Sequence, residues 1–502
     1  MNHRIHSQCW QIKAPSQEAA LAIRQQLRSQ LDTALLPVFE RAFDALAPGD
    51  EVLRIPRLTL EIKLYGGALN GDFITAVTQA LPEVLSDKLD ETLRDAALAR
   101  SIPIQPRQIG PGKIQSGEAG AQHLSAPAHQ RRTLLHYLST GLLEWHEHCA
   151  WDDGTRLQVL REEAAALAGD TSALQAALDD FSCGSLTKRL AASFRLLQLL
   201  PAGSRPALLA SAARYAGLPD NPVEAVQPAN LLPGLLRQLA SQFVVSPGGH
   251  LLLRVQAMLL ALREADLRRP FDPQIAAWLR DCQHQAATRT DSNSVEMQSA
   301  IAALFESAPA ITLPPQPANT QPPLPSPRAE DIAAIGYLTS DAGLILLHPF
   351  LPRLFTELNI TPGGILPEAM LPRAAALLHW LVNAREEVYE YELTLIKVLL
   401  GLTPSHPLPV SAGLLDKADR AEADALLAAA LSHWEVLGKT SVSTLRGTFL
   451  QRRGLLRDTD SGWQLQVETA PFDLLLGRLP WSISLVRLPW MSRPMFTEWI
   501  TP

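Results

Sequence analysis

The chain has 502 residues, of which 47% are hydrophobic and 19% are charged. The length exceeds that of a single domain, and the composition excludes a disordered chain. The formal net charge of −7 gives no electrostatic footprint for nucleic acid, so we expect no nucleic acid among the partners.

The cysteines and the N-terminus indicate a reduced, cytoplasmic setting. The four cysteines lie far apart and form no Cys-x-x-Cys pair, so neither a disulfide framework nor a zinc site is indicated; they are Cys9, Cys149, Cys183 and Cys282. The opening residues, MNHRIHSQCWQIKAPSQ, lack the apolar stretch of a signal peptide, and no run of about 18 apolar residues occurs. We therefore expect neither export by a signal peptide nor a membrane partner.

Residues 1–100 are predicted to form an N-terminal domain with a β-α-β start followed by short helices. Crude alternation of apolar residues predicts a strand over 4–13. Apolar residues at helical spacing then predict a long helix from Ser16, its candidate N-cap, to Leu46. Alternation returns over 52–64, VLRIPRLTLEIKL, and predicts a half-buried strand.

Two irregular stretches divide the rest of the chain. Residues 101–129 have little periodicity and many Pro, Gly and Gln, which predicts a flexible linker. Eight prolines without a charge fall between Pro309 and Pro327, which predicts a Pro-rich spacer over 309–328. Between them, 130–308 shows successive helical patterns separated by turn signals and predicts a helical domain, with a break in its first helix at Gly141.

Residues 329–502 are predicted to form a C-terminal domain of mixed α+β type, a helix plus a β-hairpin. Three helices are expected in its first part, over 373–384, 393–400 and 416–437. Ser443 is the candidate N-cap of a further helix. Alternation over 463–467 and again over 481–488 predicts strands with one face in water. The predicted fold class of the whole chain is therefore mainly α, a helical bundle or array, multidomain, with small β elements at both ends.

Two short motifs resemble ligand loops without completing them. Gly438-Lys439-Thr440 lacks the glycine that a phosphate loop needs five positions before Gly438, where His433 stands. The stretch 458–462, DTDSG, opens like a calcium loop, but its twelfth position is Thr469 instead of glutamate, so a turn is favoured. Neither motif predicts a bound nucleotide or calcium ion.

Clusters of titratable residues also receive structural interpretations. Three potential metal ligands lack a further cluster at zinc spacing and are interpreted as helix-end or core residues; they are His146, His148 and Cys149. Four acids are interpreted as a solvated helix face; they are Glu386, Glu387, Glu390 and Glu392. No Gly-x-Ser-x-Gly turn supports a nucleophilic triad. We therefore expect a protein that is not an enzyme and that has no catalytic residue, no cofactor and no metal.

The tryptophan-rich end of the chain is the one candidate for a binding site. Leu-Pro-Trp occurs twice, ending at Trp481 and at Trp490, and a further tryptophan follows at Trp499. Tryptophan is costly to expose and usually marks a core or an anchor at an interface. The sequence leaves both roles open, and these three residues are the candidate positions for docking a partner.

Several short sequence motifs, taken in chain order, carry a family resemblance. They are Leu36-Pro37 before RIPRLTL (54–60), DAGLILLHPFLPRLF (341–355), HWEVLGKTSVSTLRGTFLQRRG (433–454), GWQLQVE (462–468) and the repeated Leu-Pro-Trp. Together they resemble the contractile injection system tape measure proteins of phage-tail-like particles. The resemblance covers about 1–64 and 335–500.

The resemblance implies a non-enzymatic assembly component that sits within the inner tube and sets the length of tube and sheath. It implies the inner tube, the spike or baseplate and the terminal cap as partners, and it leaves a homo-oligomer inside the tube open. The expected location is the cytoplasm during assembly and then the tube. A globular baseplate adaptor or assembly chaperone of the same particle is the alternative. A continuous helix of this length would reach about 750 Å, but the proline breaks favour folded units on linkers.

Overall fold

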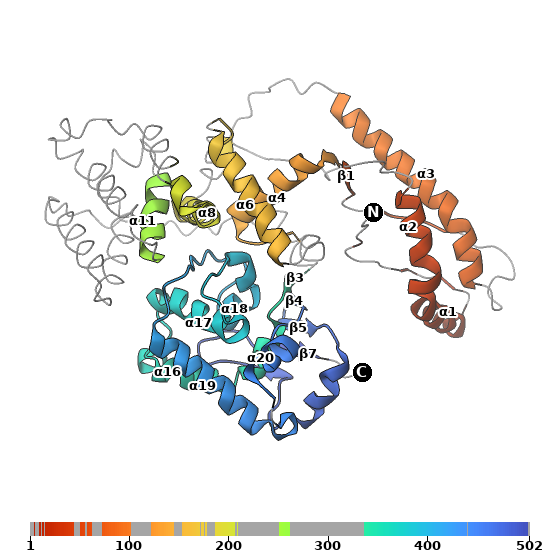
Figure 1. Ribbon diagram of the computed structural model, residues 1–502. Helices are drawn as coiled ribbons and strands as arrows, with labels where there is room; N and C mark the ends of the chain where they lie inside the picture. The colour runs from red at the N-terminus through yellow and green to blue at the C-terminus, as the bar shows by residue number, and fades with distance from the viewer. Residues whose placement is uncertain are drawn as a thin grey trace, which may run out of the picture. The chain divides into compact units, whose positions relative to one another are not determined.

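The computed structural model describes residues 16–44, 51–55, 58–62, 73–101, 122–144, 153–170, 186–205, 250–261 and 336–499 apart from 439, with a few single positions between them (5, 10, 11, 13, 14, 172–174, 176, 177 and 208). The chain forms two compact units, 1–132 and 133–502 (Figure 1). The prediction of a mainly α protein with small sheets is confirmed. No helix in the described ranges is long and apolar enough to cross a membrane.

In the described residues of the first unit, three α-helices and a π-helical turn form the hydrophobic core. They are α1 (Gln17–Gln30), η1 (Leu31–Leu35), α2 (Leu36–Asp44) and α3 (Phe73–Ser101). The Ser16 hydroxyl accepts a hydrogen bond from the Ala19 amide at 3.2 Å, so the predicted N-cap is confirmed. Helices α1 and α2 pack against α3 through one apolar face each, made of Ile23, Leu27, Leu35, Val38, Phe39, Ile74, Val77, Leu81, Leu85 and Leu89.

The strands of the first unit differ from the predicted β-α-β start. Strand β1 (Glu51–Arg54) is shorter than the predicted strand over 52–64, and it pairs antiparallel with β2 (Gln122–Ser125). The described positions of 4–13, namely 5, 10, 11 and 13, have no strand structure. Strand β2 and the start of the next helix occupy the end of the predicted linker 101–129. A partner strand about 70 residues away in sequence decides this pairing, and local alternation cannot reveal it.

Helices fill the described part of the predicted helical domain 130–308. They are α4 (Ala126–Thr140), α6 (Asp153–Gly169), α8 (Leu186–Leu199), η3 (Ala202–Ser204) and α11 (His250–Ala261). Helix α8 packs on α11 and on α6. Gly141 follows α4 with φ +73, so the predicted break lies where a glycine is needed. The spacer 309–328 and the cluster His146, His148 and Cys149 lie outside the described residues.

Helices, most of them short, are the commonest regular elements of 336–499. After strand β3 (Tyr337–Thr339) they are η6 (Ala342–Leu347), α16 (Leu351–Glu357), η7 (Pro362–Gly364), η8 (Glu368–Met370), α17 (Leu371–Asn383), η9 (Glu390–Leu393), α18 (Thr394–Leu399), α19 (Lys417–His433), η10 (Glu435–Leu437), α20 (Val442–Leu445) and η11 (Arg446–Leu450). Asp416 and Asp419 cap α19 reciprocally, each carboxylate accepting the other residue's amide. The N-cap of α20 is Ser441, whose hydroxyl accepts the Thr444 amide at 3.1 Å. The prediction of Ser443 was therefore wrong by two residues.

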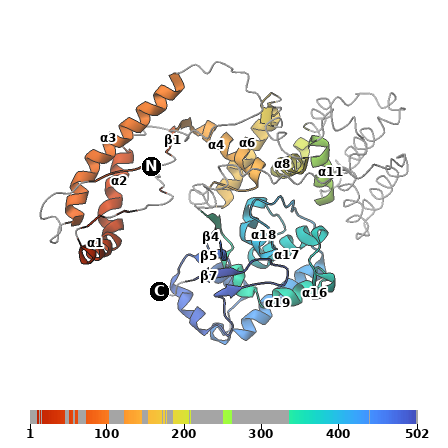
Figure 2. The ribbon, with the colours of Figure 1, turned by 180° about the vertical axis from the view of Figure 1, so that it is seen from behind.

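A five-stranded sheet lies along one side of these helices (Figures 1 and 2). Its strands run in the order β3, β4 (Gly454–Thr459), β5 (Gly462–Val467), β7 (Met495–Glu498) and β6 (Leu485–Val486), with η12 (Pro471–Arg478) between β5 and β6. The hairpin β4–β5 confirms the predicted turn at 458–462 and the predicted strand over 463–467. All pairs are antiparallel except β5 with β7.

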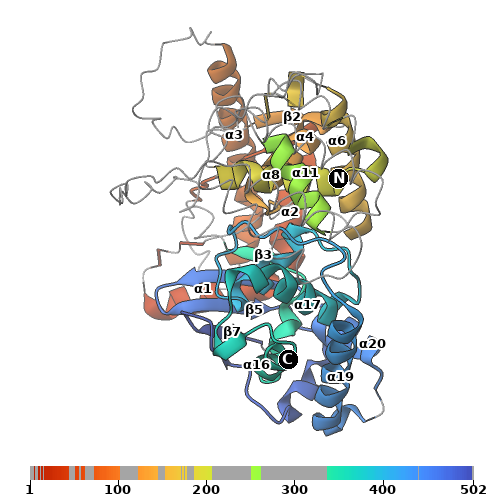
Figure 3. The ribbon, with the colours of Figure 1, turned by 90° about the vertical axis from the view of Figure 1, so that its left-hand side faces the viewer.

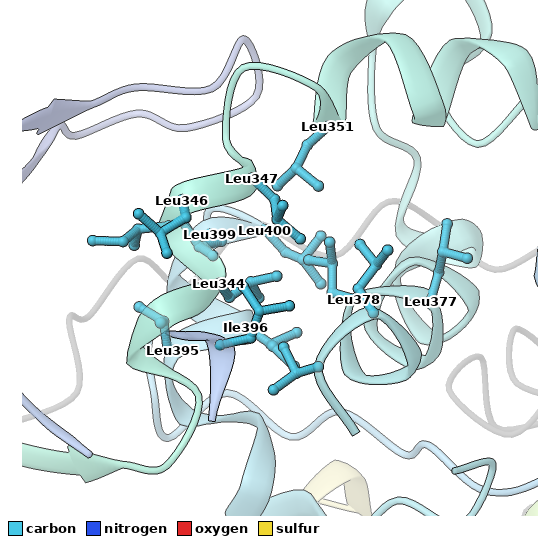
Figure 4. Close-up of a cluster of buried hydrophobic side chains, with 14 of the residues drawn as sticks. Leu344, Leu346, Leu347, Leu351, Leu377, Leu378, Leu395, Ile396, Leu399 and Leu400 are labelled. Carbon is cyan, nitrogen blue, oxygen red and sulfur yellow. The ribbon is translucent and has the colours of Figure 1, made fainter. Parts of the chain in front are cut away.

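One hydrophobic core joins the helices and the sheet of 336–499. Figure 4 shows Leu344 and Leu347 of η6 pointing toward Leu378 of α17, toward Leu399 at the end of α18 and toward Leu400, the residue that follows α18. The same core includes the inward faces of β4, β5 and β7, and α19 packs against α20 (Figure 3). The segment 341–355 therefore lies at the centre of this region instead of at its start.

The division of the chain into domains at 309–328 and 329–502 stays a prediction. Residues 133–502 form one compact unit by their contacts, and α4, α6 and α8 touch the region after 336 through side chains described below.

Candidate functional site: tryptophan anchors and a buried ion cluster

Trp481, the first candidate docking residue, is half-buried against the segment 341–355. Its indole Nε1–H donates to the carbonyl oxygen of Leu346 at 3.0 Å. Its ring meets Phe350 edge-on, with ring centroids 5.1 Å apart. The first Leu-Pro-Trp therefore fastens the C-terminal part of the chain to η6 and to the turn after it, because both the polar and the apolar part of the indole are engaged.

Trp490 repeats this arrangement at the other end of the same segment. Its Nε1–H donates to the carbonyl oxygen of Leu399 at 2.8 Å, and its ring stacks on Phe355 at 4.8 Å between centroids. Gly401, with φ +82, lies so close that a Cβ there would be 2.8 Å from the Trp490 carbonyl oxygen. The second Leu-Pro-Trp therefore closes against the end of α18, where only glycine leaves room.

Trp499 belongs to a third contact, around a buried ion pair. Its Nε1–H donates to Asp473 Oδ2 at 3.0 Å, and Arg452 lies 5.5 Å from the centre of its ring. Arg452 Nη1 also contacts Asp473 Oδ1 at 2.8 Å, and both side chains are buried. Burial alone would raise the pKa of Asp473, but the hydrogen bonds from Arg452, the Ala470 amide and Trp499 lower it. Trp499 thus contacts both members of the Arg452–Asp473 ion pair.

All three tryptophans therefore have packing partners inside 336–499. Each donates its indole N–H within the chain, which uses the polar atom that an interface anchor often offers a partner. Docking by these side chains stays a prediction, and their packing gives a direct test.

Replacing Trp490 with alanine is expected to lower the free energy of unfolding by about 3 kcal/mol, because the substitution leaves a cavity over Phe355 and an unpaired Leu399 carbonyl. The matched control is Phe472→Ala, since the Phe472 side chain is 60% exposed. Urea unfolding followed by circular dichroism should separate the two variants. If both variants unfold at the same urea concentration, Trp490 does not stabilise the core, and the result favours its role in docking a partner.

A second group of residues, which we call the Glu390 cluster, consists of Arg195, Gln198, Glu390 and Lys397. Arg195 Nε and Nη2 contact the two carboxylate oxygens of Glu390 at 2.7 and 3.0 Å, and Lys397 Nζ contacts Oε1 at 2.7 Å. The Leu408 amide also donates to Oε1 at 3.1 Å. Arg195 is 1% exposed, Glu390 3% and Lys397 0%. Two cations and one anion therefore lie together out of water.

The remaining donors of the cluster reach backbone carbonyls. Arg195 Nη1 donates to Leu138 at 2.6 Å, and Lys397 Nζ donates to Pro404 at 3.0 Å. Gln198 Nε2 donates to Val410 at 3.0 Å and also to Val388. A Cβ at Gly141 would come within 2.7 Å of Glu390 Oε1, so the glycine that ends α4 also makes space for the carboxylate. The cluster thus ties α4 and α8 to η9 and α18.

Opposing effects set the charges of the cluster. Burial alone would raise the pKa of Glu390, but Arg195 and Lys397 lower it to about 2. Burial lowers the pKa of Lys397, and Glu390 partly restores it. Glu390 is therefore ionised at neutral pH and holds the two cations together.

Aromatic contacts extend the same interface. Tyr137 of α4 meets Tyr391 edge-on, with centroids 5.5 Å apart. Arg161 of α6 donates to the Tyr389 hydroxyl at 2.7 Å and to Glu387 at 3.0 Å. Helices on the N-terminal side of the predicted spacer are thereby joined to η9 by charged and aromatic side chains together.

The interpretation of Glu390 and Glu392 as a solvated helix face was wrong. Glu390 is buried in the cluster, and the Glu392 carboxylate is buried while it accepts the Tyr389 amide at 2.8 Å and contacts Arg385. The sequence carried a weak signal for this: Glu390 stands between two tyrosines, and Lys397 interrupts the apolar run LTLIKVLL. A single charged residue within an apolar stretch of sequence is buried with the stretch only at high cost, unless an opposite charge pairs with it.

The described residues supply little for catalysis or metal binding. The stretch 458–462 is a hairpin turn, and Gly438 follows η10 with φ +53, while Lys439 lies outside the described residues. His379 is buried beside Glu392 with Nε2 3.7 Å from its carboxylate, but burial and then Arg385 lower its pKa to about 3, so it is neutral at physiological pH. Within the described ranges no three His, Cys, Asp or Glu residues gather as a metal site would require.

The fold and these contacts define a mainly helical protein whose distinctive charged and aromatic residues join its own segments. The chain belongs to the contractile injection system tape measure protein family, whose profile matches residues 2–499. The match includes the middle of the chain as well as 1–64 and 335–500, which carry the resemblance in short motifs. This family is a structural one, and association with the tube and other components of the particle follows from it. No curated protein and no solved structure matches the chain.

Proposed function

We propose that this chain sets tube and sheath length by spanning the tube during assembly, as a structural component and not as an enzyme. The observation that carries the proposal is the family match, which runs without division from residue 2 to 499 and so includes both end regions and the stretch between them. The proposed location is the cytoplasm during assembly and the inside of the tube afterwards.

The specific partners are part of the proposal. The inner tube would surround the chain, and the spike or baseplate and the terminal cap would bind its two ends. Residues 336–499 would remain folded as one end, since their core unites segments such as 341–355 and the two Leu-Pro-Trp tripeptides. Unfolding this region would expose a large apolar area at high cost.

The spanning part would then be the chain before 336. Within the compact unit 133–502, the Glu390 cluster holds α4 and α8 against η9 and α18. Extension along a tube requires these helices to separate from that region. Charged groups recover hydration when such an interface opens, so opening it costs less than opening an apolar interface of the same size.

A deletion series tests the ruler. Deleting 250–270 should shorten the tube by about 30 Å if these residues are helical in the particle, at roughly 1.5 Å per residue. Deleting 309–327 should shorten it by about 60 Å, at roughly 3.1 Å per residue of polyproline. The measurement is the distribution of particle lengths in electron micrographs, with both end regions intact.

The adaptor or assembly chaperone predicts a different result. Deletions in an adaptor would either leave the tube length unchanged or stop assembly, because the length of a globular adaptor does not determine the length of the tube. A length distribution that stays constant across all viable deletions would rule out the ruler.

A further inference from the structure

The region 336–499 closes its apolar core without the helices that precede it. That core contains buried residues from Ala342 to Met495, and no described residue of α4, α6, α8 or α11 belongs to it. Tyr389 and Tyr391, which contact those helices, are buried but lie outside the core as well. The helices therefore contact this region without completing its core.

Long polar side chains and aromatic rings cross the boundary between the two parts. Arg195 and Gln198 lie three positions apart on α8, so they share one helix face. From this face Arg195 reaches Glu390, and Gln198 reaches the carbonyls of Val388 and Val410. Further contacts join Arg161 to Tyr389 and Glu387, Tyr137 to Tyr391, and His250 to Ser411. Water can replace such hydrogen bonds when the surfaces separate.

The charged groups of the Glu390 cluster also have partners on their own side of the boundary. Glu390 would keep Lys397 at 2.7 Å and the Leu408 amide at 3.1 Å if α8 moved away. Arg195 would keep the Leu138 carbonyl of α4 at 2.6 Å. Breaking a buried ion pair is usually costly because it leaves one charge buried and alone. Separation at this boundary avoids that cost.

The four helices have contacts among themselves that would survive the separation. Helix α8 packs on α6 and on α11 (Figures 1 and 2). Arg189 of α8 donates to the Ala261 carbonyl of α11 at 2.9 Å. Phe194 of α8 meets His250 of α11 edge-on, with ring centroids 5.7 Å apart. The bond described above between α8 and α4 adds the fourth helix, so the helices can move as one body.

We propose that the contacts between α8 and the stretch 388–411 form an autoinhibitory latch. The latch holds α4, α6, α8 and α11 on 336–499 in the free chain. When it opens, the helices leave as one body and 336–499 stays folded. The closed form cannot span a tube, because the helices of the spanning part are bound to the end region. This regulation rests on the proposed function, since only a spanning chain needs the helices free.

Hydroxyl-radical footprinting of the full chain tests the latch. Tyr389 and Tyr391 are 0% and 3% exposed in the closed form, and opening should expose both rings to oxidation. Arg195→Met should therefore raise their oxidation rate by about tenfold or more, since the closed form loses its ion pair across the boundary. Phe355, in the core of 336–499, should stay as protected as in the wild type. Lys188→Met is the matched control, because Lys188 is an exposed cation on the same helix. If Arg195→Met leaves the tyrosines protected, or exposes Phe355 with them, the proposal is wrong.

A cut chain tests reversibility without changing the contact. A protease recognition sequence placed in the predicted spacer 309–328 allows the folded wild-type chain to be cut between the two parts. The pieces should stay together at high concentration and separate on dilution, because cutting removes the high effective concentration that the link provides. The separated C-terminal piece should keep the helical signal and the cooperative melting of a folded region in circular dichroism. Pieces that never separate, or a C-terminal piece that unfolds on separation, would overturn the latch.

The latch and the ruler fail separately. A deletion series without graded tube lengths would rule out the ruler but would leave the footprinting result unchanged. A chain whose tyrosines stay protected in Arg195→Met, but whose deletions shorten the tube in proportion, would overturn the latch alone.

Discussion

Replacing Gly343 with alanine is expected to prevent the region 336–499 from folding. A Cβ at this position would lie 1.7 Å from the carbonyl oxygen of Phe449 and 2.6 Å from the Cα of Leu450. Both obstacles are backbone atoms of η11, so no side-chain rotation can relieve the clash. Because η6 is at the centre of the core, we expect a loss of at least about 4 kcal/mol in the free energy of unfolding.

The neighbouring helical turn supplies a matched control. Gly447 lies in η11 itself, and a Cβ there would have no heavy atom within 4 Å. Gly447→Ala should leave stability unchanged or raise it by up to about 1 kcal/mol, because alanine favours helix over glycine. Thermal unfolding and soluble yield of the two variants decide the point. A Gly343→Ala chain that melts like wild type would contradict the close contact of η6 with η11.

Replacing Glu390 with glutamine is expected to destabilise the unit 133–502 by about 3–5 kcal/mol, because Arg195 and Lys397 would remain buried without their shared anion. Glu387→Gln is the control, since the Glu387 side chain is 56% exposed and its contact with Arg161 is a surface ion pair. Urea unfolding at neutral pH should separate them clearly.

Two further measurements identify the cause. The triple variant Arg195→Met, Glu390→Leu, Lys397→Met should recover much of the lost stability, because no buried charge is left unpaired. The folded-state pKa of Glu390, about 2, lies below its ordinary value of 4.5, so its contribution is complete above about pH 4.5 and is lost as the pH falls toward 2. Glu390→Gln should therefore lose less stability than wild type over that interval. A triple variant as unstable as Glu390→Gln alone would show that the charges are not the cause.

Local patterns in the sequence were sufficient for several of the helices and for one hairpin. Apolar residues at helical spacing and a serine before them predicted α1 with its N-cap at Ser16, and alternation predicted β5 with one face in water. These features depend on residues a few positions apart, which a sequence displays directly. The family resemblance likewise rested on short contiguous motifs, and the family match confirms it.

Only the tertiary structure decided which residues are buried together. Arg195 and Glu390 are 195 positions apart, and Trp481 and Leu346 are 135 apart. In the sequence alone, the acids around Glu390 have the pattern of a solvated helix face. Only the structure shows that Arg195 of α8 contacts Glu390. The same holds for the sheet, in which β7 lies between β5 and β6. The spacing of residues along the chain specifies which face of a helix or strand is apolar. Which other segment packs on that face depends on the free energy of burying both segments together, and residues far apart in the sequence determine it.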